Sequence, residues 1–553
     1  MPNGAQALMK TLADAGIEVC FSNPGTSEMH FVAALDNEPR MRPVLALFEG
    51  VATGAADGYA RMADKPAAVL LHLGCGLGNG LANLHNARKG KVPVVNIVGD
   101  HATYHQRLDA QLQSDIETVA RNVSPGFVRS SQSTQQLCRD AVDAVAAANG
   151  PPGQVATLIL PADVSWGEGG EPAAPPELAT PQAADDDTVA AIARAVRDGG
   201  KTALLLGGRA LRQNVLEQAA RIAAHCGVKL FCEVFPTRLQ RGAGRPAVER
   251  IAYLAELATL QLSQFDHLVL VDAKAPVSFF AYPGKPSELV PDACQVHTLA
   301  TPAQDSQASL AKLVAALGAE QASPVHQQAA RPGRPRGRLS AEKVCKAVGH
   351  LLPENAIIVD EANTSGLMLP VMTAGAPPHD LITLTGGAIG QSLPNAVGAA
   401  IACPDRPVLA LVGDGSAMYT NQALWSMARE QLDITVVVFA NAAYSILNVE
   451  LERVGASSSG GPKARSQLDL TGPGLDFARM AQGMGVHAVR ADTAEDFCRA
   501  MDYAFAHPGP HLIEAQIPES LNRTKRRILP WLLRSIPKMP KPMARALKGK
   551  LAP

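Results

Sequence analysis

The chain has 553 residues, of which 47% are hydrophobic and 18% are charged, and its formal net charge is −1. This length exceeds what one hydrophobic core supports, and the composition is that of a globular protein rather than a disordered one. The near-zero charge gives no reason to expect a nucleic-acid partner. Nine scattered cysteines, none in a CxxC pair, and the lack of a signal-peptide core or a membrane-spanning apolar run favour a soluble cytoplasmic protein.

Two stretches without periodic apolar residues are interpreted as linkers. Residues 167–187 are rich in Pro, Ala and acidic side chains, and residues 326–338 are rich in Pro, Gly and Arg. They predict a first domain at 1–168, a central domain at 185–325, a third domain at 338–518 and a basic tail at 519–553.

Short apolar runs alternate with longer amphipathic ones in each of the three segments. The predicted strands are 69–72, 92–98, 203–206, 267–271, 356–360, 407–412 and 434–439. The predicted helices are 49–61, 76–88, 215–224, 393–403 and 422–431. This alternation predicts an α/β fold of three doubly wound parallel-sheet domains, with ligands at the carboxyl ends of the strands.

In the first domain, an apolar run from Leu45 to Phe48 ends in a carboxylate, Glu49. A Glu that begins a helix is commonly a surface partner of the helix dipole. Phe48 and the small-residue helix that follows indicate a buried setting instead. Burial raises the pKa of a carboxyl group strongly, which would let Glu49 share a proton with a neutral ring nitrogen.

In the third domain, Gly413-Asp414-Gly415-Ser416 follows one predicted strand and Asn441 ends the next. Adjacent parallel strands bring their carboxyl ends together, so Asp414 and Asn441 can share one cation. Both offer the hard oxygen ligands that Mg²⁺ prefers. The glycines let the backbone approach an anion closely. The alternative, a tight turn whose Asp caps a helix, does not account for Asn441.

GDG followed at this distance by Asn is the signature of thiamine-diphosphate (ThDP) enzymes, and residues 413–447 resemble benzoylformate decarboxylase. The resemblance implies that Asp414, the Asn441 side chain and the Ala443 carbonyl bind Mg²⁺. The residues that would then lie near the diphosphate are Gly415, Ser416, Tyr444, Ser445 and, after the strand at 356–360, Thr364 and Ser365.

The same resemblance assigns the pyrimidine end of the cofactor to the first domain. Glu49 would activate the aminopyrimidine, and Asn23, Pro24 and Gly25 would flank it. In the turn at 386–390, Ile389 would prop the cofactor in its bent form and the Gly387 carbonyl would accept from its 4′-amino group. Because family members bind the two ends with different subunits, the resemblance implies at least a homodimer, and a homotetramer is common.

The resemblance implies an enzyme that cleaves or forms a carbon–carbon bond next to the carbonyl of a 2-oxo acid substrate. Thr26 and His72 match a hydroxyl residue and the first of two substrate histidines in benzoylformate decarboxylases. The second histidine is missing from residues 275–281, which favours carboligation over simple decarboxylation. The alternatives are a 2-hydroxyacyl-CoA lyase-type ThDP enzyme and a non-catalytic relative of the fold.

The chain also resembles acetolactate-synthase large subunits in its length and in its opening segment at 21–28. Those enzymes bind FAD in the middle domain, but no glycine-rich dinucleotide loop supports FAD here. Residues 521–553 hold ten Lys/Arg and no Asp/Glu. This tail is interpreted as a flexible basic extension, with a lid over the active site or a membrane-surface contact as the alternatives.

Overall fold

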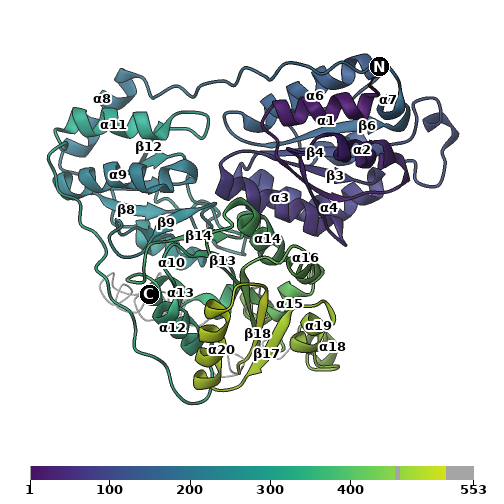
Figure 1. Ribbon diagram of the computed structural model, residues 1–553. Helices are drawn as coiled ribbons and strands as arrows, with labels where there is room; N and C mark the ends of the chain where they lie inside the picture. Colours follow the sequence, from purple (N-terminus) through teal and green to yellow (C-terminus); the bar gives the residue numbers. More distant parts are fainter. Residues whose placement is uncertain (1, 455–460, 519–553) are drawn as a thin grey trace.

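The computed structural model describes residues 2–454 and 461–518 (Figure 1). Within these ranges three sheets of six, five and seven strands are flanked by helices, so the predicted three-domain α/β class is confirmed. None of the helices in the described part of the chain has the length and apolar character needed to cross a membrane. The alternatives for the basic tail concern residues 519–553, which lie outside the described residues.

The first sheet is entirely parallel, with strand order β2-β1-β3-β4-β6-β5. Its strands are β1 (Val19–Asn23), β2 (Arg42–Leu45), β3 (Ala67–Leu71), β4 (Val94–Asp100), β5 (Val128–Ser130) and β6 (Val155–Pro161). Its helices are α1 (Gly4–Asp14), α2 (Met29–Ala34), α3 (Glu49–Ala63), α4 (Leu73–Gly90), α5 (Ile116–Arg121), α6 (Thr134–Asn149) and α7 (Ala162–Trp166). Strands β3, β4 and β6 are buried along their whole length and mostly apolar because helices cover both faces, with α1 and α6 on one and α3 and α4 on the other (Figure 1).

The middle sheet is also parallel, with strand order β10-β8-β7-β11-β12. Its strands are β7 (Thr202–Leu206), β8 (Lys229–Cys232), β10 (Glu249–Arg250), β11 (His267–Val271) and β12 (Gln295–Ala300). Its helices are α8 (Asp186–Arg197), α9 (Gln213–Cys226), α10 (Ala255–Leu262) and α11 (Ser306–Leu317), with the 3-10 turn η4 (Gly208–Leu211) after β7.

The third sheet has strand order β17-β18-β16-β15-β13-β14-β9. Its strands are β13 (Ile357–Glu361), β14 (His379–Thr383), β15 (Val408–Gly413), β16 (Ile434–Ala440), β17 (His487–Ala491), β18 (His511–Gln516) and β9 (Leu239–Arg241). Its helices are α12 (Ala341–Leu351), α13 (Leu369–Met372), α14 (Ser392–Ala402), α15 (Asp414–Ala417), α16 (Ala423–Arg429), α17 (Ser445–Arg453), α18 (Pro462–Ser466), α19 (Phe477–Gly483) and α20 (Ala494–Ala506). Strand β9 comes from the middle segment and pairs antiparallel with β14, an edge that the sequence patterns did not predict.

Helices α3 and α14 join the first and third domains (Figure 1). They approach so closely that a Cβ atom at Gly58 would lie 2.1 Å from the Asn395 carbonyl oxygen, and one at Gly398 would lie 1.9 Å from that of Ala55. One buried apolar cluster therefore runs from the first sheet into the third. This packing brings the start of α3, and with it Glu49, toward the turn that precedes α14.

Candidate active site

Glu49 is the first residue of α3, as predicted, but its surroundings are less buried than expected. Strand β2 ends at Leu45, and the three residues before Glu49 form a connection rather than a strand. The Glu49 side chain is half-buried, and one carboxylate oxygen accepts a hydrogen bond from the Asn79 side chain at 3.1 Å. The rest of α3, from Gly50 to Met62, is buried. The carboxylate thus stands at the exposed end of a buried helix.

The segment from Asn23 to Thr26 leaves the carboxyl end of β1 beside this carboxylate-bearing connection. The Asn23 side-chain amide donates to the Ala46 carbonyl at 2.8 Å, which ties the two loops together. Pro24 and Gly25 follow and are half-buried, and Thr26 begins a 3-10 turn, η1 (Thr26–Glu28), with its side chain exposed. All four predicted residues therefore lie at the strand ends where a ligand is expected.

His72 lies at the end of β3 and is held by a carboxylate that the sequence reasoning did not single out. Its Nδ1 atom is 2.8 Å from Glu28 Oε2, and Glu28 is completely buried. The same carboxylate accepts the Gly25 backbone N–H at 2.7 Å and the Ser27 hydroxyl at 2.7 Å. A carboxylate on one ring nitrogen fixes the orientation of an imidazole and leaves the other nitrogen for chemistry. Glu28 stands in the run Thr26-Ser27-Glu28, but its pairing with His72 is seen only in the folded structure.

Asp414 and Asn441 meet at the ends of the neighbouring strands β15 and β16, as predicted. The Asp414 carboxylate accepts backbone N–H groups from Gly415 at 2.8 Å, Asn441 at 2.9 Å and Ala442 at 2.6 Å. Burial raises the pKa of Asp414, while these N–H donors lower it. The Asn441 side-chain oxygen accepts the Ala443 N–H at 3.0 Å. The three predicted metal ligands therefore lie at one edge of the third sheet.

The predicted diphosphate residues surround this edge. Ser365, in the turn η5 (Asn363–Gly366), is buried, and its hydroxyl lies 3.4 Å from the Asn441 side-chain amide. The Ser416 hydroxyl lies 3.4 Å from the Asn363 side-chain amide. Thr364, between them in the same turn, is half-buried and contributes no hydrogen bond of its own among the described residues.

Gly415, Tyr444 and Ser445 complete the predicted set. A Cβ atom at Gly415 would lie 2.3 Å from the Tyr444 ring, so only glycine lets that ring lie over the backbone. The Ser445 hydroxyl is buried and has no hydrogen-bond partner among the described residues. A buried hydroxyl without a partner is costly unless a ligand satisfies it.

The turn at 386–390 connects this edge to the first domain. Gly387 has a φ of +77°, which favours glycine, and Ile389 is half-buried. Asn83 of α4 donates both to the Gly50 carbonyl at the start of α3, at 2.8 Å, and to the Gly390 carbonyl at 3.4 Å. Residues of one helix therefore hold the start of α3 and the turn at 386–390 together.

A second carboxylate that sequence reasoning did not assign, Glu361 at the end of β13, fixes the same turn. It is buried and accepts the backbone N–H groups of Gly390 at 2.6 Å and Ser392 at 2.7 Å. Burial raises the pKa of the Glu361 carboxyl.

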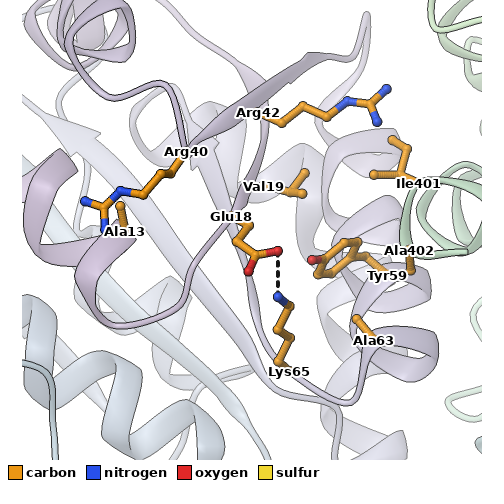
Figure 2. A pocket seen from close by; sticks show the side chains of 10 residues that line it. All are labelled: Ala13, Glu18, Val19, Arg40, Arg42, Tyr59, Ala63, Lys65, Ile401 and Ala402. Carbon is orange, nitrogen blue, oxygen red and sulfur yellow. Dashed lines mark ion pairs between the residues drawn. The ribbon is translucent and has the colours of Figure 1, made fainter. Parts of the chain in front are cut away.

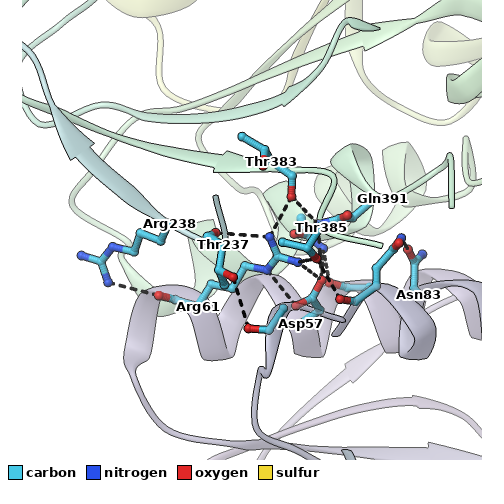
Figure 3. A network of polar contacts seen from close by, with 12 residues as sticks. Asp57, Arg61, Asn83, Thr237, Arg238, Thr383, Thr385 and Gln391 are labelled. Atoms are coloured by element: carbon cyan, nitrogen blue, oxygen red, sulfur yellow. Dashed lines mark hydrogen bonds and ion pairs between the residues drawn. The ribbon is translucent and has the colours of Figure 1, made fainter. Parts of the chain in front are cut away.

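A buried polar network lies directly beneath this turn (Figure 3). Arg61 and Asp57 of α3 form an ion pair at 2.8 Å in which both side chains have no exposed area. Arg61 also donates to the Thr383 carbonyl at 2.8 Å and the Thr385 hydroxyl at 2.9 Å, and to the Thr237 carbonyl at 3.2 Å. One guanidinium thereby bonds to all three domains.

The segment at 275–281, where no second histidine was found, presents aromatic rings. The Phe279 ring lies against Gly387, where a Cβ atom would be 2.5 Å from it. It also packs on Phe235, Tyr253 and Phe280 with ring centroids 5.0–6.0 Å apart. The wall beside the predicted pyrimidine position is therefore apolar.

A separate cavity of about 630 Å³ opens at the amino ends of β1 and β2 (Figure 2). Its cations are already paired, Lys65 with Glu18 at 2.6 Å and Arg42 with Glu430 at 2.7 Å. Because parallel sheets bind ligands at the opposite, carboxyl ends of their strands, this cavity is not part of the candidate site.

The residues present fit magnesium and ThDP. A carboxylate, a carboxamide and a carbonyl at one place are the oxygen donors that Mg²⁺ takes, and the unpartnered Ser445 hydroxyl points to a missing polar group beside them.

Two family descriptions match the chain in these same regions. "Thiamine pyrophosphate enzyme, N-terminal TPP binding domain" matches residues 2–121, and "Thiamine pyrophosphate enzyme, C-terminal TPP binding domain" matches residues 365–515. The chain belongs to the thiamine pyrophosphate enzymes, and the resemblance drawn from its motifs is confirmed.

Particular relatives lie within that family. Over 518 residues the chain is 57% identical to a Mycobacterium tuberculosis protein named "Putative acetolactate synthase large subunit IlvX", covering 93% of this chain and 99% of that protein. It is 28% identical to a Pseudomonas aeruginosa benzoylformate decarboxylase over 535 residues, 90% of this chain and 96% of the relative. The solved structure of the Rhodococcus jostii ThDP-dependent 4-hydroxybenzoylformate decarboxylase superposes with a TM-score of 0.81 at 23% identity, covering 94% and 99% of the two chains, which shows the shared fold.

Proposed function

We propose that this chain, with ThDP and Mg²⁺, joins a 2-oxo acid to a second carbonyl compound after loss of CO₂, a carboligation of the acetolactate-synthase type. The observation that carries the proposal is the meeting of Asp414, Asn441 and Ala443 at one edge of the third sheet, together with the Glu49 carboxylate at the open end of α3 in the first domain. The 57% identity to a protein named "Putative acetolactate synthase large subunit IlvX" supports carboligation rather than simple decarboxylation.

When bound, ThDP would supply a carbon nucleophile for the 2-oxo acid carbonyl and a sink for the electron pair left by CO₂. Glu49 would exchange a proton with the pyrimidine ring through its carboxylate, since its half-buried position lets it face a ligand while α3 anchors it. Asp414, Asn441 and the Ala443 carbonyl would hold Mg²⁺, which would neutralise the diphosphate. Gly387 and Ile389 orient the pyrimidine end.

His72 and Phe279 supply the argument for ligation. Glu28 fixes His72 through Nδ1, so its Nε2 atom delivers or removes one proton beside Thr26. The segment at 275–281 carries no imidazole, and its Phe279 ring lies against Gly387 instead. An apolar wall excludes water and delivers no second proton, which gives an incoming carbonyl compound time to react.

We propose at least a homodimer as the working unit, and a homotetramer as its expected assembly. Exposed apolar side chains flank the site in the single chain: Leu47, two residues before Glu49, is 49% exposed, and Tyr419, beside Gly390, is 52% exposed. A second chain would cover them. Light scattering after gel filtration tests this, and a monomer that retains full activity would contradict it.

Product analysis tests the reaction. The purified chain is incubated with ThDP, Mg²⁺ and pyruvate or phenylglyoxylate, with and without an aldehyde acceptor. A ligation product that requires both cofactors supports the proposal. Release of free aldehyde without ligation would indicate a decarboxylase, and no turnover of either acid would indicate a non-catalytic relative or a different acyl donor. Glu49→Gln should abolish turnover, whereas Glu117→Gln, an exposed position on α5, should not.

A further inference from the structure

The middle domain has the strand order of a nucleotide-binding sheet. Strand β8 lies on one side of β7 and β11 on the other, so the order reverses between β7 and β11. Ligands of such sheets bind outside the carboxyl ends of the strands at this reversal. The turn Gly207-Gly208-Arg209 follows β7 at that point, and its backbone N–H groups are the ones that a phosphate would use.

Two carboxylates of the chain itself occupy this turn. Asp272, the residue after β11, accepts the Arg209 N–H through Oδ2 at 2.7 Å. The Asp272 carboxylate also lies against Gly208, where a Cβ atom would be 2.3 Å from Oδ2. Glu233, the residue after β8, lies against Gly207, where a Cβ atom would be 2.7 Å from its carboxylate, and it accepts a backbone hydrogen bond from Gly208.

The position of Asp272 is built into the backbone. Its φ is +51°, in the left-handed region that non-glycine residues rarely adopt, and its N–H is bonded to the Ala300 carbonyl at 2.8 Å. The side chain is buried. The carboxylate is therefore part of the folded domain rather than a surface group that swings aside.

We propose that the middle domain does not take FAD or another dinucleotide diphosphate, because Asp272 and Glu233 hold the amide groups and the space that the diphosphate would need. A diphosphate placed there loses its N–H donors and meets two acidic side chains, and like charges in contact disfavour binding. The chain then differs from the flavin-binding synthases that it resembles and works with ThDP and Mg²⁺ alone. This inference depends on the middle sheet and not on the proposed reaction.

The flavin content of the intact protein tests the proposal first. The full chain is purified from riboflavin-supplied cells, and released flavin is measured after denaturation. ADP and FAD are then titrated into the ThDP- and Mg²⁺-loaded protein by calorimetry. Flavin far below one per chain and no binding of either nucleotide in the micromolar range are expected. One bound flavin per chain, or micromolar binding of FAD, would overturn the proposal.

Variants test the cause. Asp272→Gly with Glu233→Ala vacates the turn, and glycine suits the positive φ at 272. This double variant should bind ADP at least about tenfold more tightly than the parent. The matched control is Asp266→Gly, at the amino end of the same strand β11, which should not change ADP binding. If the vacated turn binds ADP no better than the parent, the role assigned to the two carboxylates is wrong.

Discussion

The third and middle domains each place an aspartate beside a glycine-containing turn at the end of a central strand, yet their surroundings differ. Asp414 accepts N–H groups from its own turn and from the end of β16, where Asn441 supplies a neutral carboxamide. Asp272, at the end of β11, accepts an N–H of the turn after β7, and its companion is a second acid, Glu233, from the end of β8 on the other side of β7.

The difference shows that a glycine turn alone does not define an anion site. In the third domain, Asp414 and Asn441 bring together oxygen atoms that suit a cation, and a bound cation would attract phosphate. In the middle domain they consume the N–H groups of the turn. The side chain at the end of a nearby strand therefore decides whether such a turn can bind a cofactor or has its N–H groups occupied by the protein itself.

Matched substitutions of the two aspartates should give the largest difference in activity between the two domains. Asp414→Asn should lower activity by more than about a thousandfold, because Mg²⁺ would lose its charged ligand and the diphosphate would lose the cation that neutralises it. Asp272→Asn should leave activity within about twofold. Turnover and ThDP affinity, followed by fluorescence quenching at saturating Mg²⁺, measure both. Equal losses in the two variants would show that the middle turn serves the cofactor after all.

The buried pair Asp57–Arg61 should come next, because it ties the two regions together through α3. Arg61→Ala would leave Asp57 charged and without its guanidinium in a site with no exposed area, a loss of about 3–5 kcal/mol in the free energy of unfolding. The double variant Asp57→Asn with Arg61→Met should recover part of that loss. Thermal melting of both measures the effect, and Arg121→Ala on exposed α5 is the control.

Periodicity and composition predicted most of the fold because parallel strands buried on both faces are continuously apolar. Strand β11 matches its predicted range at 267–271, and most other predicted elements differ by a few residues at their ends. Strand β9 was missed because its three residues carry no apolar run and pair only across domains. The domain boundaries at 168, 185, 325 and 338 stay predictions.

The candidate site was predictable where a motif spans consecutive strands. Asp414 and Asn441 meet as the spacing predicts. Glu28 and Glu361 were not assigned, since each acts on residues far away in sequence, Glu28 on His72 and Glu361 on Gly390. In the single chain Glu49 is half-buried, less than expected, because β2 ends at Leu45 and leaves the carboxylate at the open end of α3.

The pH dependence of stability tests whether Glu233 and Asp272 are held in the turn after β7. Burial raises the pKa of Glu233 to about 7 and that of Asp272 to about 6. The other charged groups that act on these two are Lys91, Lys274, Arg209 and Arg212. Because the folded pKa of Glu233 exceeds its unfolded value, the folded state loses stability as pH rises from about 4.5 to 7.

Glu233→Gln should remove that loss. The variant should be more stable than the parent at pH 8 by up to about 3 kcal/mol, less what water screens, and no more stable at pH 4. Melting temperatures at the two pH values measure the difference. Glu256→Gln, a carboxylate of α10 that is paired with Arg453, is the contrasting control and should destabilise the protein at pH 8. A stabilisation of Glu233→Gln that is equal at both pH values would contradict the assignment.

Glu28 offers the smallest test of the difference between the candidate active site and the turn after β7. Like Glu233, it lies at the carboxyl edge of a sheet and accepts the backbone N–H of a glycine, here Gly25. Unlike Glu233, it also holds an imidazole, that of His72. Glu28→Gln keeps an oxygen for Gly25 but removes the charge that fixes one His72 tautomer, so kcat should fall by about tenfold while KM and the melting temperature change little. Ser27→Ala, which removes only a neighbouring hydroxyl, should leave kcat unchanged. An equal loss in kcat and thermal stability would mean that Glu28 only supports the loop and has no role in the reaction.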